Sequence, residues 1–243
     1  MSKSDGTENS YMNAGEKVHK VLIVDDHAIL REGLIQLINS TPGLSVCGAA
    51  KNAHEGFELI EKTMPDVVLV DISLPGKSGL ELIKDIHAAY PDIALLVLSM
   101  HEESLYAERV LRAGARGYLM KNEGGQKLIA AIQKVLAGGI SVSERVANRI
   151  LQGVSGKRKA LSISPIEALS DREFEVFQLI GKGYGSRQIA EQLSLSVKTV
   201  EAYRASIKQK LYLKSGPQLV HYAISWQQSQ TSGIDSESSP VKS

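Results

Sequence analysis

The segment KVLIVDDHAILREGLIQLIN, residues 20–39, indicates the fold class of the first half of the chain. It begins with a continuously apolar run, which is typical of a strand in a parallel sheet that is covered on both faces. Two aspartates follow, and apolar residues then recur at helical spacing over 28–39. A buried strand that leads into an amphipathic helix is the repeating unit of an α/β domain.

This unit is repeated along the next hundred or so residues. After VLIVD (21–25), the apolar runs are LSVCGAA (44–50), VVLVD (67–71), IALLVLS (93–99) and GYLM (117–120). Helical patterns follow the five runs at 28–39, 53–63, 79–89, 102–113 and 126–137. Five strands that alternate with five helices predict a doubly wound, five-stranded parallel α/β domain over residues 18–138.

The rest of the chain has a different pattern. Residues 139–164 predict a basic linker that follows Gly138 and contains a helix over 141–154. Residues 165–226 predict a small all-helical domain, because no strand pattern occurs there. The terminal segments 1–17 and 227–243 are rich in Ser, Gly and charge, and we expect both to be disordered.

Composition and charge restrict the possible classes of protein. The 243 residues are 43% hydrophobic and 23% charged, as in ordinary globular proteins. We find neither a membrane-spanning stretch nor a secretory signal, and the single cysteine, Cys47, cannot form an internal disulfide; we therefore expect a cytoplasmic protein without a membrane partner. Residues 186–214 carry 6 Lys or Arg against 2 Asp or Glu, which favours a polyanionic partner for the second domain.

Polar side chains gather at the predicted strand ends of the first domain. Asp25 and Asp26 end the first strand, Asp71 the third and Ser99 the fourth, and Lys121 follows the fifth. The carboxyl ends of parallel strands meet at one edge of a sheet, where ligands bind in open α/β folds. Three carboxylates at this edge would repel one another, and Mg²⁺ with its preference for hard oxygen ligands resolves that conflict.

This set of groups suits the transfer of a phosphoryl group to a carboxylate. A metal ion and Lys121 would neutralise the phosphoryl oxygens, and Ser99 would add a hydroxyl. Asp71 is the better acceptor because it stands alone on the central strand. For each aspartate separately, capping of the next helix is an alternative explanation.

The motifs VLIVDDH, LVDISLPGKSG, LSM and GYLMK make residues 20–138 resemble the receiver domain of response regulators, which has a flavodoxin-like fold. The resemblance implies that Asp71 is phosphorylated. It implies that Asp26, Asp71 and the backbone carbonyl of Ser73 bind Mg²⁺, and that Asp25 assists through water. In many receivers a proline follows the lysine that corresponds to Lys121, whereas Asn122 follows it in this chain.

The resemblance also assigns the residues that respond to phosphorylation. Lys121 would contact the phosphoryl group, Ser99 would follow that group, and Tyr118 would swing inward behind it. Such changes would alter the face formed by the fourth strand, the fourth helix and the fifth strand.

The second domain contains a pattern of short helices. Ser170 and Glu173 fit a capping box at a helix start. A short helix over 186–193, a turn at 194–196 and a helix that begins near Val197 follow in sequence, which is the order of a helix-turn-helix motif.

The last of these helices has a polar outer face. Its outward residues are Lys198, Thr199, Glu201, Ala202, Arg204, Ala205 and Lys208. A helix of this kind can enter the major groove of DNA, although an ordinary solvated basic face is the alternative.

The stretch 169–211 resembles the LuxR-type helix-turn-helix, and its fusion to a receiver places the resemblance in the NarL/FixJ family, over residues 20–226. The resemblance implies phosphate contacts through Lys198, Thr199, Tyr203, Arg204 and Lys208, and base contacts through Glu201, Ala202 and Ala205. Some relatives have lysines at the positions of Glu201 and Ala205, so their base preferences do not transfer. The segment Pro217–Trp226 resembles a fourth helix, with a dimer contact through Leu219, Val220 and Ala223.

The combined expectation is a transcription regulator that is not an enzyme. A histidine kinase would phosphorylate Asp71, and the receiver, which would cover the reading helix at rest, would release a homodimer onto double-stranded promoter DNA. Two alternatives stay open: a phosphotransferase or phosphatase that uses the acidic pocket, and a module whose helical domain binds only protein.

Overall fold

The computed structural model describes residues 17–154 and 165–232. Three segments lie outside the described residues: 1–16 and 233–243, which we expected to be disordered, and 155–164, the basic part of the expected linker. Residues 227–232, which we expected to be disordered, are helical. Within the described ranges, no helix is long and apolar enough to cross a membrane.

The first domain is a five-stranded parallel sheet with the order β2-β1-β3-β4-β5, which confirms the predicted fold class. Its strands are β1 (His19–Val24), β2 (Leu44–Ala50), β3 (Val67–Asp71), β4 (Ala94–Ser99) and β5 (Gly117–Met120). Its helices are α1 (Ala28–Asn39), α2 (Ala53–Thr63), α3 (Gly79–Ala89), α4 (Glu103–Arg112) and α5 (Gly125–Leu136). Every residue of β3 and β4 is buried, as the continuous apolar runs predict.

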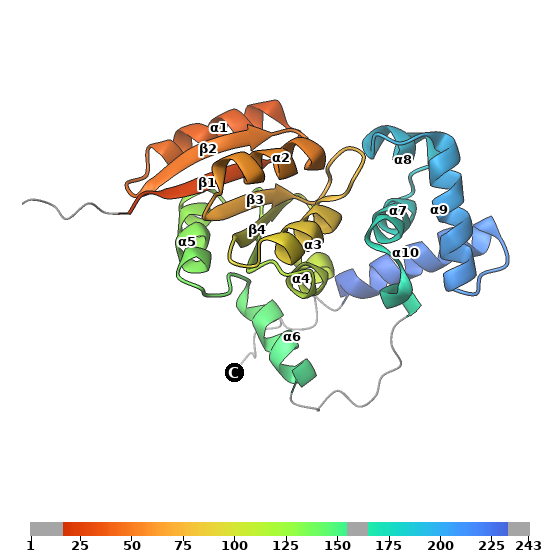
Figure 1. The fold of residues 1–243 in the computed structure, drawn as a ribbon. Helices are drawn as coiled ribbons and strands as arrows, with labels where there is room; N and C mark the ends of the chain where they lie inside the picture. The colour runs from red at the N-terminus through yellow and green to blue at the C-terminus, as the bar shows by residue number, and fades with distance from the viewer. Residues whose placement is uncertain (1–16, 155–164, 233–243) are drawn as a thin grey trace, which may run out of the picture.

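The helices cover the sheet on both faces (Figure 1). Residues of α1 and α5 pack into one apolar cluster that includes Val21, Leu69 and Leu96. Residues of α2, α3 and α4 pack into the other, which includes Leu22 and Val70. Each central strand therefore sends alternate side chains into two separate cores, and its carboxyl end is the place where it can present polar groups.

The second domain is helical. It comprises a short 3-10 helix η1 (Pro165–Ala168) and the helices α7 (Asp171–Gly181), α8 (Ser186–Gln192), α9 (Val197–Lys210) and α10 (Gly216–Ser232). The expected capping box is present at α7: the Ser170 hydroxyl accepts from the Glu173 amide, and the Glu173 carboxylate accepts from the Ser170 amide. Helix α6 (Glu144–Val154) lies between the domains in sequence and contacts α4.

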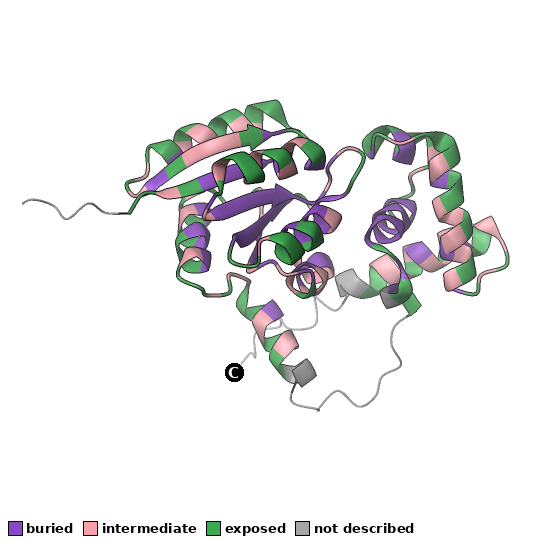
Figure 2. Cartoon of the chain, in the orientation of Figure 1, coloured by how far each residue is buried: buried purple, intermediate pink, exposed green. Residues whose placement is uncertain are grey.

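The two domains touch through α7. All ten residues from Asp171 to Ile180 are buried, including four charged ones (Figure 2). One apolar cluster runs across the contact and contains both Tyr106 of α4 and Phe174 of α7. Helix α9 lies on the side of α7 away from the sheet (Figure 1). Our expectation that the receiver covers the reading helix is therefore wrong for this structure, because α7 occupies the contact instead.

Candidate functional site

The strand ends bring the predicted acidic residues together. Asp25 directly follows β1, Asp71 ends β3, and each is 2% exposed. The side chain of Asp26 is 37% exposed, so it lies at the mouth of the pocket. One oxygen from each of the three carboxylates and one ring nitrogen of His27 lie within 4.8 Å of one another. A set of hard oxygens at this spacing, open to solvent on one side, fits a Mg²⁺ ion that keeps several waters.

Lys121 provides the positive charge in this pocket. Its Nζ lies 2.7 Å from Asp71 Oδ2 and 2.8 Å from Asp25 Oδ2. Lys121 follows β5, Asp71 ends β3 and Asp25 follows β1, so the sheet edge assembles a site from residues up to 96 positions apart in sequence. The lysine is thereby placed to contact any anion that joins Asp71.

Burial and charge act on these groups in opposite directions. Burial, together with the neighbouring Asp25 carboxylate, raises the pKa of Asp71 above its ordinary value, and Lys121 offsets part of that rise. For Lys121 burial lowers the pKa, but contacts with Asp71 and Asp25 outweigh burial, and the net pKa is raised. The lysine is therefore charged at neutral pH, and it stabilises negative charge on the acceptor side of the pocket.

His27 is a member of this cluster that the sequence reasoning missed. Its Nδ1 lies 2.8 Å from Asp26 Oδ1 and 3.1 Å from Asp25 Oδ1. The available signal was its position directly after the aspartate pair.

The predicted switch residues lie next to the pocket. Ser99, at the end of β4, is fully buried, and its Oγ accepts from the His101 amide at 3.1 Å. Tyr118 is 2% exposed, and its hydroxyl donates to the His101 carbonyl at 2.7 Å. The ring of Tyr118 is therefore already inside, without the swing that we expected phosphorylation to cause.

His101 connects these residues to the loop that follows β3, and sequence reasoning missed it too. Its Nε2 lies 2.8 Å from Ser73 Oγ. Burial, followed by the charges of Lys182 and Lys121, lowers the pKa of His101 to about 4, so the ring is neutral at pH 7. The neutral ring can share one hydrogen bond with Ser73, the residue whose carbonyl we expected to bind metal. No sequence motif singled out His101.

The predicted reading helix is α9. Ser196 caps it by accepting from the Thr199 amide at 3.0 Å. All eight residues predicted to contact DNA lie on this helix, and none is buried. Lys198, Glu201, Ala202 and Ala205 are exposed, and Thr199, Tyr203, Arg204 and Lys208 are partly exposed.

Two details limit the freedom of side chains on α9. The Ser186 hydroxyl of α8 donates to the carboxylate of Glu201, and Arg204 Nε lies 3.9 Å from the same carboxylate. Glu201 is thus held at the junction of α8 and α9. A restrained carboxylate can accept from a cytosine amino group without losing much side-chain freedom.

The predicted dimer contact on α10 is only partly available. Leu219 and Ala223 are 0% and 1% exposed, and α10 packs against α7. These two residues belong to the interior of the domain, so our assignment of them to a dimer contact is wrong here. Val220 is partly exposed but also packs against the core.

Comparisons with known proteins agree with this architecture. Residues 21–133 match the response regulator receiver domain, and residues 167–223 match the bacterial regulatory proteins of the luxR family. The chain is 38% identical to the oxygen regulatory protein NreC of Staphylococcus carnosus over 209 residues, which cover 84% of this chain and 96% of that protein.

Solved structures of a response regulator are similar to this chain over most of its length. RcsB of Salmonella typhimurium, a response regulator, is similar with a TM-score of 0.59 and 25% identity, covering 86% of this chain and 98% of that one. A second RcsB structure, from Salmonella enterica serovar Typhimurium bound to the promoter rprA in the presence of the phosphomimetic BeF₃⁻, has a TM-score of 0.55 at 25% identity and covers 84% of this chain and 98% of that one.

The fold, the acidic edge of the sheet and the helix-turn-helix define a two-domain signalling protein that binds DNA. The chain belongs to the response regulators that join a receiver domain to a LuxR-type helix-turn-helix, in the NarL family. It is a phosphorylation-dependent, DNA-binding transcription regulator.

Proposed function

We propose that Asp71 is the residue through which phosphorylation controls this regulator. The observation that carries the proposal is the shared pocket: the Asp71 carboxylate lies beside two further carboxylates and 2.7 Å from the Lys121 ammonium. An oxygen of Asp71 attacks the phosphorus of a phosphohistidine on a sensor kinase. A P–O bond forms, the P–N bond breaks, and the leaving nitrogen keeps the electron pair and takes up a proton.

The remaining residues of the pocket hold and report the new group. Asp25, Asp26, Asp71 and the Ser73 carbonyl would hold Mg²⁺, which supplies charge neutralisation for the phosphoryl oxygens. Lys121, whose ammonium lies beside Asp71, would contact the phosphoryl group. Ser99 donates its hydroxyl to that group and gives up the His101 amide, and Tyr118 holds the His101 carbonyl while this change occurs.

DNA binding takes place through α9. Lys198, Thr199, Tyr203, Arg204 and Lys208 hold backbone phosphates, and Glu201, Ala202 and Ala205 face base edges in the major groove. Two copies of this small domain bind two half-sites of promoter DNA as a homodimer. The exposure of this face in the full chain supports the proposal, as does the RcsB structure that was solved on promoter DNA.

Labelling with a small phosphodonor tests the acceptor. Acetyl phosphate with Mg²⁺ should add one phosphoryl group to the wild-type chain, detected by intact-mass spectrometry. Asp71→Asn should take up none, whereas Asp85→Asn, an exposed aspartate on α3, should behave as wild type. Undiminished uptake by Asp71→Asn would refute the assignment.

A further inference from the structure

The loop that follows the proposed acceptor is held by the DNA-binding domain. Arg172, in the first turn of α7, is 3% exposed. Its Nη2 donates to the backbone carbonyls of Leu74, at 2.8 Å, and Gly76, at 2.6 Å. These carbonyls lie three and five residues beyond Asp71, in the same loop as Ser73.

In the Arg172 guanidinium, Nη1 and Nη2 have hydrogen-bond partners, and the buried Nε has none among the described residues. Its Nη1 donates to the carboxylate of Glu175, which is 2% exposed. A buried ion pair has already lost its water, so removal of the two carbonyls would leave part of the guanidinium without acceptors. The position of this loop and the docking of α7 therefore depend on each other.

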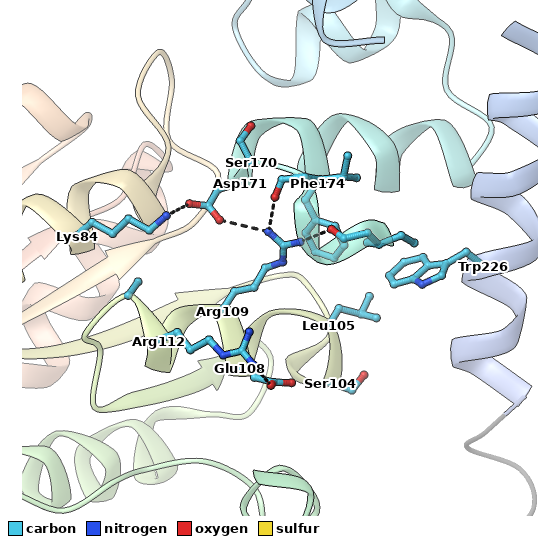
Figure 3. A pocket seen from close by; sticks show the side chains of 13 residues that line it. Lys84, Ser104, Leu105, Glu108, Arg109, Arg112, Ser170, Asp171, Phe174 and Trp226 are labelled. Atoms are coloured by element: carbon cyan, nitrogen blue, oxygen red, sulfur yellow. Dashed lines mark hydrogen bonds and ion pairs between the residues drawn. The ribbon is translucent and has the colours of Figure 1, made fainter. Parts of the chain in front are cut away.

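A reciprocal arginine reaches from the receiver to the DNA-binding domain (Figure 3). Arg109 of α4 donates to the carbonyls of Ile166, at 2.7 Å, and Leu169, at 3.0 Å. Its guanidinium lies 4.2 Å from the centre of the Phe174 ring, a cation–π contact. Each domain thus inserts one arginine into backbone carbonyls of the other.

A second route joins the same loop to α7 through packed rings. Ser73 Oγ contacts His101, the His101 ring lies 4.9 Å from Tyr106, and the Tyr106 ring lies 5.2 Å from that of Phe174. The proposed metal-binding residue Ser73 is therefore connected to α7 through side chains as well as through the carbonyls that Arg172 holds.

The interface is not closely packed throughout. A pocket of about 380 Å³ lies between the domains, with Arg109, Phe174 and Trp226 among its lining residues (Figure 3). Protein interiors leave few voids larger than a water molecule. Separation of the domains would expose buried apolar side chains such as Tyr106 and Phe174, but the pocket leaves part of this interface unpacked.

We propose that Arg172 is a positioning residue for the phosphorylation site: it ties the loop after Asp71 to α7, so that docking of the DNA-binding domain lowers the affinity of the acceptor site for a phosphoryl group. This inference rests on the proposed role of Asp71. If the Ser73 carbonyl turned toward a bound metal ion, the Leu74 and Gly76 carbonyls that Arg172 holds, one and three residues further along the same loop, would move with it. The two equilibria are linked. If a bound phosphoryl group favours undocking of α7 by some factor, undocking of α7 must raise the affinity for the phosphoryl group by the same factor.

The test measures beryllofluoride binding with Mg²⁺ by calorimetry in the full-length chain. The variant Arg172→Gln with Glu175→Gln removes both charges of the buried pair together, so neither remains unpaired. We expect its affinity for beryllofluoride to rise about fivefold or more. Arg112→Gln is the matched control, because this arginine lines the same pocket but pairs within α4 with Glu108. Its affinity should equal that of wild type.

A second variant separates undocking from damage to the helical domain. Arg109→Gln lies on the receiver, and it breaks the reciprocal contact while leaving α7 chemically unchanged. It should raise beryllofluoride affinity in the same direction. Trp226, the sole tryptophan, packs 5.7 Å from Phe174 at this interface, so its emission should shift to longer wavelength in both variants before the ligand is added.

Each outcome decides a separate question. No binding of beryllofluoride by wild type would contradict the proposed role of Asp71. Binding by wild type with unchanged or weaker binding by the two interface variants would overturn the inference about Arg172 alone.

Discussion

Helices α7 and α9 both carry several charged residues, yet they use them in opposite ways. On α7 the four charged residues Asp171, Arg172, Glu173 and Glu175 are buried and find partners inside the protein. On α9 the charged residues that we assign to DNA are exposed or partly exposed. Charge alone therefore does not identify a ligand surface, because the buried charges on α7 hold the protein together and the accessible charges on α9 can contact a polyanion.

The largest expected effect is on stability at α7. Arg172→Leu leaves Glu175 buried without its partner, and we expect the free energy of unfolding to fall by about 3–5 kcal/mol. The double variant with Glu175→Leu should recover most of this loss. Urea unfolding measures both, and Lys198→Leu on α9 is the exposed control. If Arg172→Leu costs no more than that control, the contrast between the helices fails.

The pH dependence of stability sharpens the same contrast. Burial, only partly offset by Arg172, raises the pKa of Glu175 to about 7 from 4.5. The folded state thus binds this proton more tightly than the unfolded chain does. The contribution of this proton to the free energy of unfolding is fully present below about pH 4.5 and is lost as the pH rises through 7.

In wild type, Glu175 should lower the free energy of unfolding by up to about 1.4 kcal/mol per pH unit between pH 5 and 7, and Glu175→Gln should abolish this decrease. His101, whose pKa is lowered to about 4 from 6.5, contributes with the opposite sign. Its contribution to the free energy of unfolding increases as the pH rises from 4 to 6.5. In Glu175→Gln, stability should consequently rise from pH 5 to 6.5 more steeply than in wild type. Parallel curves for the two proteins would show that Glu175 does not titrate in this range.

Substitutions on α9 should weaken DNA binding and leave the free energy of unfolding nearly unchanged. Lys198→Ala and Arg204→Ala should each weaken binding similarly for all DNA sequences and flatten the slope of log affinity against log salt by about 0.9. Fluorescence anisotropy across a series of salt concentrations measures this slope. Lys214→Ala, an exposed lysine outside α9, should keep the wild-type slope. An unchanged slope in either α9 variant would remove that residue from the phosphate-binding set.

The smallest expected effect is at the rim of the interface between the domains. Lys84 Nζ lies 2.7 Å from Asp171 Oδ2, but the lysine side chain is 56% exposed. Solvent screens such a pair, so Lys84→Ala should change the free energy of unfolding by less than about 1 kcal/mol. A loss as large as that of Arg172→Leu in the same urea experiment would mean that exposure does not distinguish these two ion pairs.

Most of the fold was predictable because its signals are local. Continuous apolar runs identify buried parallel strands, and the rule that their carboxyl ends share one edge brings Asp25, Asp71 and Lys121 together without knowledge of side-chain geometry. His101 could not be found in this way, because its contacts with Ser73 and Tyr118 depend on the path of the loop after β4.

The interface between the domains was also beyond sequence reasoning. Charged residues are usually exposed, so nothing marked Arg172 and Glu175 as buried. The carbonyls that satisfy Arg172 lie 98 and 96 residues away in sequence. The polar end of α10 was misleading in the opposite sense: Gln227 and the residues after it are typical of a disordered tail, but the helix continues to Ser232.

The central claim is that the state of Asp71 controls DNA binding by α9. Promoter fragments captured from the source genome allow affinity to be measured by anisotropy with and without beryllofluoride and Mg²⁺. We predict that the ligand tightens binding by wild type about fivefold or more and leaves Asp71→Asn unchanged. Equal affinities for wild type in the two conditions, or the same gain in Asp71→Asn, would contradict the account.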